Sequence, residues 1–146
     1  MQKLIIYKVS TTYKGDFMLT VLPIQEKTIQ KELCKSCGIE YNEYSFAYKA
    51  DDDIFLGVCQ FYFSDACGII NGFKCAPETN DEEAMIIMLR TAMNFMHRCG
   101  LKTSKILPNA STERLLELSG YTKCDDGSYT IDLDEFYISP CHYKKK

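Results

Sequence analysis

The sequence lacks a long apolar run, an excess of positive charge and a secretion signal. A membrane-spanning helix needs about 18 or more consecutive apolar residues, and no stretch of this chain reaches that length. A net charge of -3 gives no general attraction for nucleic acid or anionic lipid. The apolar stretch near the N-terminus is short and is soon interrupted by Lys8, unlike a signal peptide. We therefore expect a cytoplasmic protein with no nucleic-acid or membrane partner.

Histidine is also scarce, with His97 and His142 as its two occurrences. Neither lies in a pattern with serine or cysteine that would specify a nucleophilic triad. His97 falls near the end of a long helical pattern, where the helix dipole favours a cation, so we expect a structural role. His142 follows Cys141 near the C-terminus, where a place at the mouth of a site and a solvated tail are both open.

Cysteine, in contrast, occurs eight times at irregular spacing. In a reducing compartment most of these thiols are expected to pack as small apolar side chains. Cys34 and Cys37 form a Cys-x-x-Cys pair, which suggests zinc binding or redox chemistry. The pair falls at the end of a helical pattern, where the dipole does not lower a thiol pKa, and there is no second pair. We expect a packing role for the pair and no metal site.

The apolar pattern predicts one domain over residues 1–146, in the α/β (mixed α+β) class. Helical spacing predicts helices over 23–37, 80–99 and 111–118, with Asn80 as the N-cap of the second. Strand patterns, with turn signals at 51–53 and 125–127, fall at 3–9, 44–49, 54–63, 68–75, 105–107, 121–123 and 129–133. The order β-α-β-β-β-α-β-α-β-β predicts a central, mostly antiparallel mixed sheet with helices on both faces.

The run from Gly68 to Tyr121 is the most specific part of the sequence. An apolar strand ends at Ala76-Pro77 and is followed by a polar loop, a Met-rich helix, a short strand and a helix between Asn109 and Gly120-Tyr121. This order and spacing resemble the cofactor-binding half of the GNAT N-acetyltransferase superfamily. The resemblance implies a GNAT-like acyl-CoA N-acyltransferase fold in which the strands at 68–75 and 105–107 part, so that acetyl-CoA lies between them.

The resemblance also implies which residues would hold the cofactor. Backbone groups of Phe73, Lys74 and Cys75 would pair with the pantetheine arm. Asn109 would contact acetyl-CoA, or would cap its helix, with Ser111 as a rival cap. Asn71, on the parted strand, would orient the substrate.

The loop that would hold the cofactor diphosphate departs from the family pattern. Family members carry Arg or Gln and glycines there, because glycine lets backbone N–H groups approach an anion at a helix N-terminus. This chain has Asp81, Glu82, Glu83 and Ala84 near the diphosphate position. These carboxylates stabilise a helix start and repel a diphosphate, so they are either helix-start residues alone or part of a weakened cofactor site.

Catalytic residues are not specified by the sequence. The family tyrosine that protonates the departing thiolate corresponds to Leu116, which has no proton to give. The strand 68–75 carries no carboxylate to act as a general base. Another tyrosine can substitute for the acid, and catalysis can rest on positioning.

Two functions follow from these observations. The first is a divergent N-acetyltransferase that transfers an acetyl group from acetyl-CoA to a small-molecule or peptide amine. The second is an inactive GNAT-like domain that binds a ligand or another protein, which the acidic loop and Leu116 favour. Exposed sheet edges leave a homodimer open.

Overall fold

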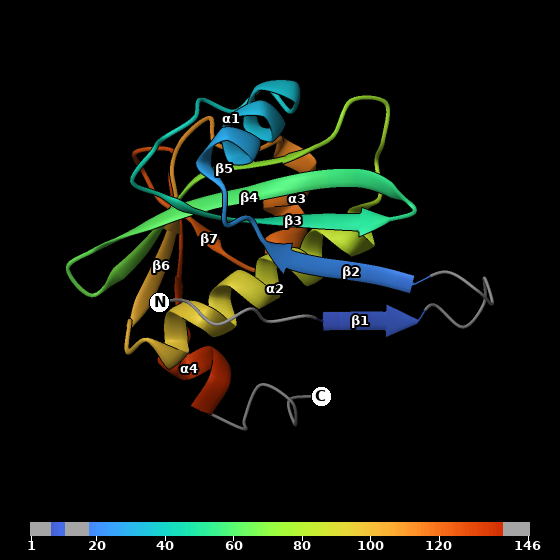
Figure 1. Ribbon diagram of the computed structural model, residues 1–146. Coiled ribbons are helices and arrows are strands. Elements are labelled where there is room, and N and C mark those ends of the chain that lie inside the picture. Colours follow the sequence, from blue (N-terminus) through green and yellow to red (C-terminus); the bar gives the residue numbers. More distant parts are fainter. Residues whose placement is uncertain (1–6, 11–17, 139–146) are drawn as a thin grey trace.

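A computed structural model describes residues 7–10 and 18–138. These residues form one sheet and four helices (Figure 1). The strands are β1 (Tyr7–Ser10), β2 (Met18–Pro23), β3 (Phe46–Asp52), β4 (Ile54–Ser64), β5 (Cys67–Cys75), β6 (Thr103–Ile106), β7 (Thr122–Lys123) and β8 (Tyr129–Asp132). The helices are α1 (Lys27–Ser36), α2 (Glu82–Arg98), α3 (Glu113–Ser119) and α4 (Leu133–Ile138). No helix in these ranges is long and apolar enough to cross a membrane.

The sheet is mixed and mostly antiparallel, as predicted. Its strand order is β1-β2-β3-β4-β5-β6-β8-β7, and β5 and β6 form the parallel pair among these neighbours. Helix α1 lies on one face of the sheet and α2 crosses the other (Figure 1). Both predicted hairpins are confirmed, since β3 pairs with β4 and β7 pairs with β8 in antiparallel register.

Two apolar cores lie on the two faces of the sheet. The larger core is rich in methionine from α2, and Met85, Met88, Met93 and Met96 are fully buried there. The smaller core lies under α1 and contains Cys34, Cys37, Ile39, Ala47, Val58 and Ala76. Unbranched methionine fits the irregular space left by a twisted sheet, so the Met-rich helix of the sequence prediction packs in this core.

The structure corrects the beginning and the end of the predicted order. Pro23 does not begin a helix but ends β2, where it pairs with Tyr48 of β3. Strand β2 was not predicted, although its alternating burial is typical of a strand with one covered face. At the other end, residues 133–138, Tyr137 among them, form helix α4, which was not predicted. Tyr44 also lies outside the strands and is 84% exposed.

His97 ties α2 to α4, in agreement with its predicted structural role. Its Nε2 atom lies 3.1 Å from Oδ1 of Asp134, and its ring stacks on Tyr137 with centroids 5.0 Å apart. Lys102 approaches the same carboxylate at 3.2 Å, and its hydrogen bond is the main cause that lowers the pKa of Asp134. Cys141 and His142 lie outside the described residues, as does most of the predicted strand 3–9.

Gly57 of β4 lies against β5 and α2, and it gives a test of the packing. A Cβ atom added there would lie 2.8 Å from the Lys74 carbonyl oxygen and 2.5 Å from Sδ of Met85. We expect Gly57→Ala to lower the free energy of unfolding by about 1–3 kcal/mol, because the paired strand must shift. Ile54→Ala on the same strand, 59% exposed in the wild type, is the control and changes it by less than about 0.5 kcal/mol. Urea denaturation measures both, and equal effects would contradict the packing described.

Candidate functional site

The site lies where β5 and β6 part. The two strands pair from Cys67 with Thr103 to Ile70 with Ile106, and the regular ladder stops there. At the same point β5 holds one extra residue, because Gln60 of β4 faces Gly72 while Phe61 faces Ile70. Asn71 is therefore the residue of a β-bulge. A bulge bends its strand and disrupts pairing, which explains why the predicted separation begins at this residue.

The chain after β6 crosses back to β5 further along the gap. The Phe73 N–H donates to the Ala110 carbonyl oxygen at 2.8 Å, and Oγ of Ser111 donates to the Phe73 carbonyl oxygen at 2.5 Å. Phe73 is fully buried. Its backbone, which the family resemblance assigns to pantetheine, is thus already paired with residues 110–111.

A cavity of about 510 Å³ occupies the space beside this crossing. Its walls are residues 38–42 after α1, residues 71, 72 and 74 of β5, and residues 107–110 after β6. Three residues of the sequence prediction meet there, Asn71, Lys74 and Asn109. Phe73, Cys75 and the turn 81–84 do not line it.

Glu40 and Tyr41 also line the cavity, and the sequence did not single them out. Of the described lining residues, Glu40 and Lys74 carry charge, and Nζ of Lys74 donates to the Gly38 carbonyl oxygen at 3.3 Å. Burial, followed by the Glu43 carboxylate, raises the pKa of the Tyr41 phenol, which therefore keeps its proton at neutral pH. No sequence signal marks these two residues, because they lie in a loop that only the tertiary fold brings to β5.

A network of buried side-chain amides holds this loop against the bulge. Nε2 of Gln30 donates to Oε1 of Gln60 at 3.0 Å, and Nε2 of Gln60 donates to Oδ1 of Asn71 at 3.2 Å. Gln60 also binds the loop backbone, donating to the Glu40 carbonyl oxygen at 3.1 Å and accepting from the Asn42 N–H at 3.1 Å. Gln30 and Gln60 are fully buried. Because a buried polar network rigidifies its surroundings when its members are paired, the cavity wall at Glu40 and Asn71 is held in place.

The start of α2 is occupied by its own carboxylates. The N-cap is Asp81, whose Oδ1 accepts from the Ala84 N–H at 3.0 Å, so the prediction of Asn80 as the cap is wrong. Glu82 and Glu83 follow in the first turn. Burial first, and then the carboxylates of Asp81 and Glu82, raise the pKa of the Cys75 thiol. Negative charge therefore acts on the end of β5 that the resemblance assigns to the cofactor.

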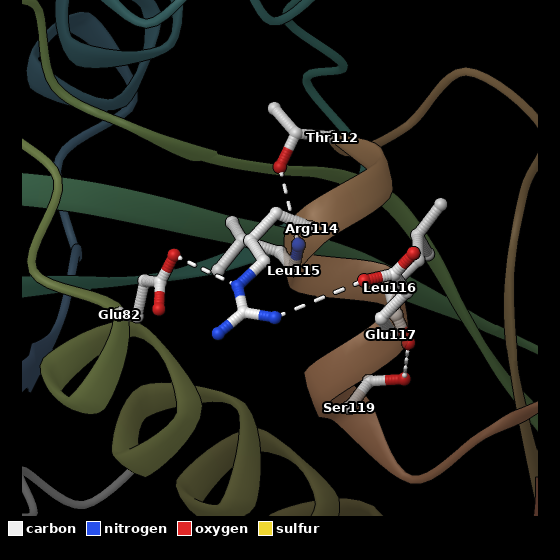
Figure 2. Close-up of polar contacts among 7 residues, drawn as sticks. All are labelled: Glu82, Thr112, Arg114, Leu115, Leu116, Glu117 and Ser119. Carbon is white, nitrogen blue, oxygen red and sulfur yellow. Dashed lines mark hydrogen bonds and ion pairs between the residues drawn. The ribbon is translucent and has the colours of Figure 1, made fainter.

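Arg114 of α3 binds the first of these glutamates (Figure 2). Its Nε lies 3.1 Å from Oε2 of Glu82, and its Nη1 lies 3.8 Å from Oε1 of Glu117. The hydrogen bond that Arg114 donates to Glu82 is the main cause that raises the pKa of Arg114. The Arg114 guanidinium is thus paired with protein carboxylates.

The start of α3 also differs from the prediction. Its cap is Thr112, whose Oγ1 accepts from the Leu115 N–H at 3.3 Å (Figure 2). Asn109 and Ser111 were the two predicted caps, and both are wrong. Asn109 instead takes a left-handed φ of 70°, a conformation that asparagine tolerates better than most residues. Leu116 packs against the larger core and does not line the cavity.

The Cys-x-x-Cys pair lies where the sequence placed it, at the C-terminal end of α1. Cys34 and Cys37 are both buried free thiols. Burial, with a smaller effect of Cys37, raises the pKa of Cys34 to about 12. Cys59 is also buried in β4, and burial raises its pKa. No group of three or more potential metal ligands occurs within residues 7–10 and 18–138.

Solved structures of acetyltransferases share this arrangement of elements. The ribosomal-protein-S18-alanine N-acetyltransferase of Escherichia coli superposes with a TM-score of 0.60 at 8% identity, over 80% of this chain and 94% of that one. The IAA acetyltransferase of Bacillus cereus gives 0.60 at 17% identity, over 73% and 78%. A probable GNAT-family acetyltransferase of Chromobacterium violaceum gives 0.56 at 9% identity, over 81% and 84%. The chain has the GNAT fold. No family model matches its sequence, and no curated protein does.

The GNAT fold implies acetyl-CoA, and the two ends of that molecule meet different surroundings here. The cavity at the parted strands has room for an acyl group and a thioester arm. The diphosphate end does not fit the start of α2, because Asp81 already binds the Ala84 N–H and two glutamates follow. Phe73 offers no unpaired backbone N–H either. The described residues therefore leave room for the acyl end, but they disagree with the pantetheine contact at Phe73 and with the diphosphate end.

Removal of the Asp81 carboxylate tests its role as the cap. We expect Asp81→Ala to lower the free energy of unfolding by about 1 kcal/mol, because the Ala84 N–H loses its partner. Asn80→Ala removes the neighbouring, predicted cap and is the control, with an effect below about 0.5 kcal/mol. Chemical denaturation measures both variants, and a larger loss for Asn80→Ala would restore the original assignment.

Thiol reactivity tests the burial of Cys34. Because its pKa is raised from 9.0 to about 12, Cys34 stays protonated when the pH rises from about 7 to about 10. Cys99, in contrast, is exposed to the reagent. Alkylation followed by peptide mass spectrometry is expected to show rapid labelling of Cys99 and none of Cys34 until the protein is unfolded. The folded state binds the Cys34 proton more tightly, so its contribution to stability is lost as the pH rises from 9.0 to about 12. Equal labelling rates for the two thiols would contradict the structure.

Proposed function

We propose that this protein is an N-acetyltransferase that takes an acetyl group from acetyl-CoA and transfers it to an amine bound in the cavity between residues 38–42, β5 and residues 107–110. The observation that carries the proposal is the coincidence of three features at one place: the Asn71 bulge, the parting of β5 from β6, and the cavity of about 510 Å³. Acetyl-CoA supplies the acetyl group as a thioester.

Glu40 and Tyr41 supply the proton chemistry that the strand 68–75 and Leu116 lack. The Glu40 carboxylate accepts a proton from a bound ammonium, which leaves the amine neutral and nucleophilic. The neutral amine then forms a C–N bond to the acetyl carbon as the C–S bond of the thioester breaks. The Tyr41 phenol, which keeps its proton at neutral pH, donates that proton to the departing thiolate and takes up the second proton of the amine. Both residues line the same cavity, and the amide network at Gln60 fixes the loop that carries them.

The acetyl-CoA contact differs from that of the family at the diphosphate. Lys74 is the cation at the cavity wall, and it takes the place of the basic loop that precedes α2 in other members. Because Asp81 and Glu82 repel an anion at the helix start, we expect weak binding of the cofactor.

Transfer assays on matched variants test the two catalytic assignments. We expect Glu40→Gln and Tyr41→Phe each to reduce acetyl transfer by about a hundredfold or more, the usual range for loss of a general base or acid, while the affinity for acetyl-CoA stays the same. Glu32→Gln is the control, since Glu32 is an exposed carboxylate of α1 that does not line the cavity. Mass spectrometry of the amine gives the rate and calorimetry gives the affinity; variants with wild-type rates would overturn these roles.

A second function, a GNAT-fold domain that binds a ligand without catalysis, rests on the pairing of Phe73. Its N–H is bound to Ala110 and its carbonyl to Ser111, so the pantetheine position is partly closed. Calorimetric titration separates the two functions. Binding of acetyl-CoA at micromolar concentration supports the transferase, and no heat at millimolar concentration supports the non-catalytic domain.

A further inference from the structure

A second cavity, of about 580 Å³, adjoins the one described. It shares Asn42, Asn71 and Leu107 with the first cavity. The rest of its wall is aromatic and consists of Tyr44, Phe46, Tyr62 and Phe63. We name these four residues the aromatic groove. No described residue that lines it carries a charge.

The floor of the aromatic groove is held by ring packing. The Phe46 ring lies 5.1 Å from Phe63, 5.6 Å from Phe61 and 5.5 Å from Phe95, centroid to centroid. Phe46 is nevertheless 36% exposed, so one side of a fixed ring faces the groove. Tyr44 stands at the rim with 84% of its surface exposed, and its N–H donates to Oδ1 of Asn42 at 2.8 Å. A preformed aromatic wall of this kind suits a flat apolar ligand, which gains edge-to-face or offset contacts.

The two cavities differ in chemistry across their shared boundary. The first contains the Glu40 carboxylate, which attracts an ammonium. The second contains aromatic rings and uncharged amides. A molecule that spans the boundary at Asn71 therefore needs a primary amine at one end and an uncharged aromatic body at the other.

We propose that the aromatic groove selects the acceptor, and that the acceptor is a small primary amine that carries an aromatic ring. The ring lies on Phe46 and Phe63, and the amine reaches past Asn71 toward Glu40. This inference rests on the proposed acetyl transfer for its role as a substrate site, but its binding step does not need acetyl-CoA.

The absence of tryptophan from the chain allows a direct binding test. Tryptamine is the probe, because its indole fluorescence is then the only indole signal in the sample, and its anisotropy reports binding. We expect Phe46→Leu to weaken tryptamine binding by about tenfold. Phe55→Leu is the matched control, since Phe55 is a half-buried phenylalanine that packs in the smaller core; it should change affinity by less than about twofold. Tyr44→Ala, at an exposed position that folding does not depend on, should weaken binding by about threefold.

Three results overturn the proposal or separate it from acetyl transfer. If both Phe46→Leu and Tyr44→Ala bind tryptamine with wild-type affinity, the aromatic groove is not the binding site and the proposal is overturned. Equal rates of acetylation of tryptamine and ethanolamine would support acetyl transfer. They would overturn the proposal that the aromatic groove selects the acceptor. Tryptamine binding that depends on Phe46, without transfer from acetyl-CoA to any amine, supports the groove as a binding site and overturns the proposed enzyme activity.

Discussion

The site depends on one extra residue in β5. Asn71 has no partner of its own in β4, because Gln60 faces Gly72 and Phe61 faces Ile70, and the ladder between β5 and β6 ends at the preceding residue. The inserted side chain turns toward the α1 face, where Gln60 binds it. This single hydrogen bond joins the bulge to the same amide that holds the loop at Glu40. The cavity therefore has a wall that the fold itself positions, and no ligand is needed to form it.

The GNAT fold is combined here with an altered anion site. In the family the helix after the parted strand begins with glycines that expose its N–H groups. Here the Asp81 side chain binds one of them and Glu82 pairs with Arg114. Capping stabilises α2 by its own means, and the same carboxylates oppose a diphosphate.

The two cavities have different roles in the proposed reaction, proton transfer in the first and binding of the aromatic ring in the second. Charged and ionisable groups, Glu40, Tyr41 and Lys74, line the first, while aromatic rings line the second. Asn71 belongs to both walls. A bulge residue at the boundary is well placed to set the distance between the reacting amine and the apolar body that carries it. The geometry accounts for a substrate with two chemically different ends.

Local pattern was sufficient for much of the fold. The Met-rich helix, the hairpin between β3 and β4 and the strand at 67–75 were predicted from periodicity and turn residues, because each depends on neighbours in sequence. Strand β2 was missed because Pro23 suggested a helix start, and α4 because its few residues are held by contacts with α2, such as that of Asp134 with His97. The predicted caps lie one to three residues before the observed caps, Asp81 and Thr112. Both loops contain several neighbouring residues of types that can cap a helix, so the sequence does not single one out.

The sequence by itself determined the GNAT-like order of elements and the acidic start of α2, both of which are written in consecutive residues. Only the tertiary structure decided which groups meet. It brought Glu40 and Tyr41 to the cavity, paired Phe73 with Ala110, and placed Phe46 beside Phe63. These contacts join residues far apart in the chain, and their partners are chosen by strand register and by one bulge. No local pattern encodes them, because a shift of one residue would exchange the two faces of the strand.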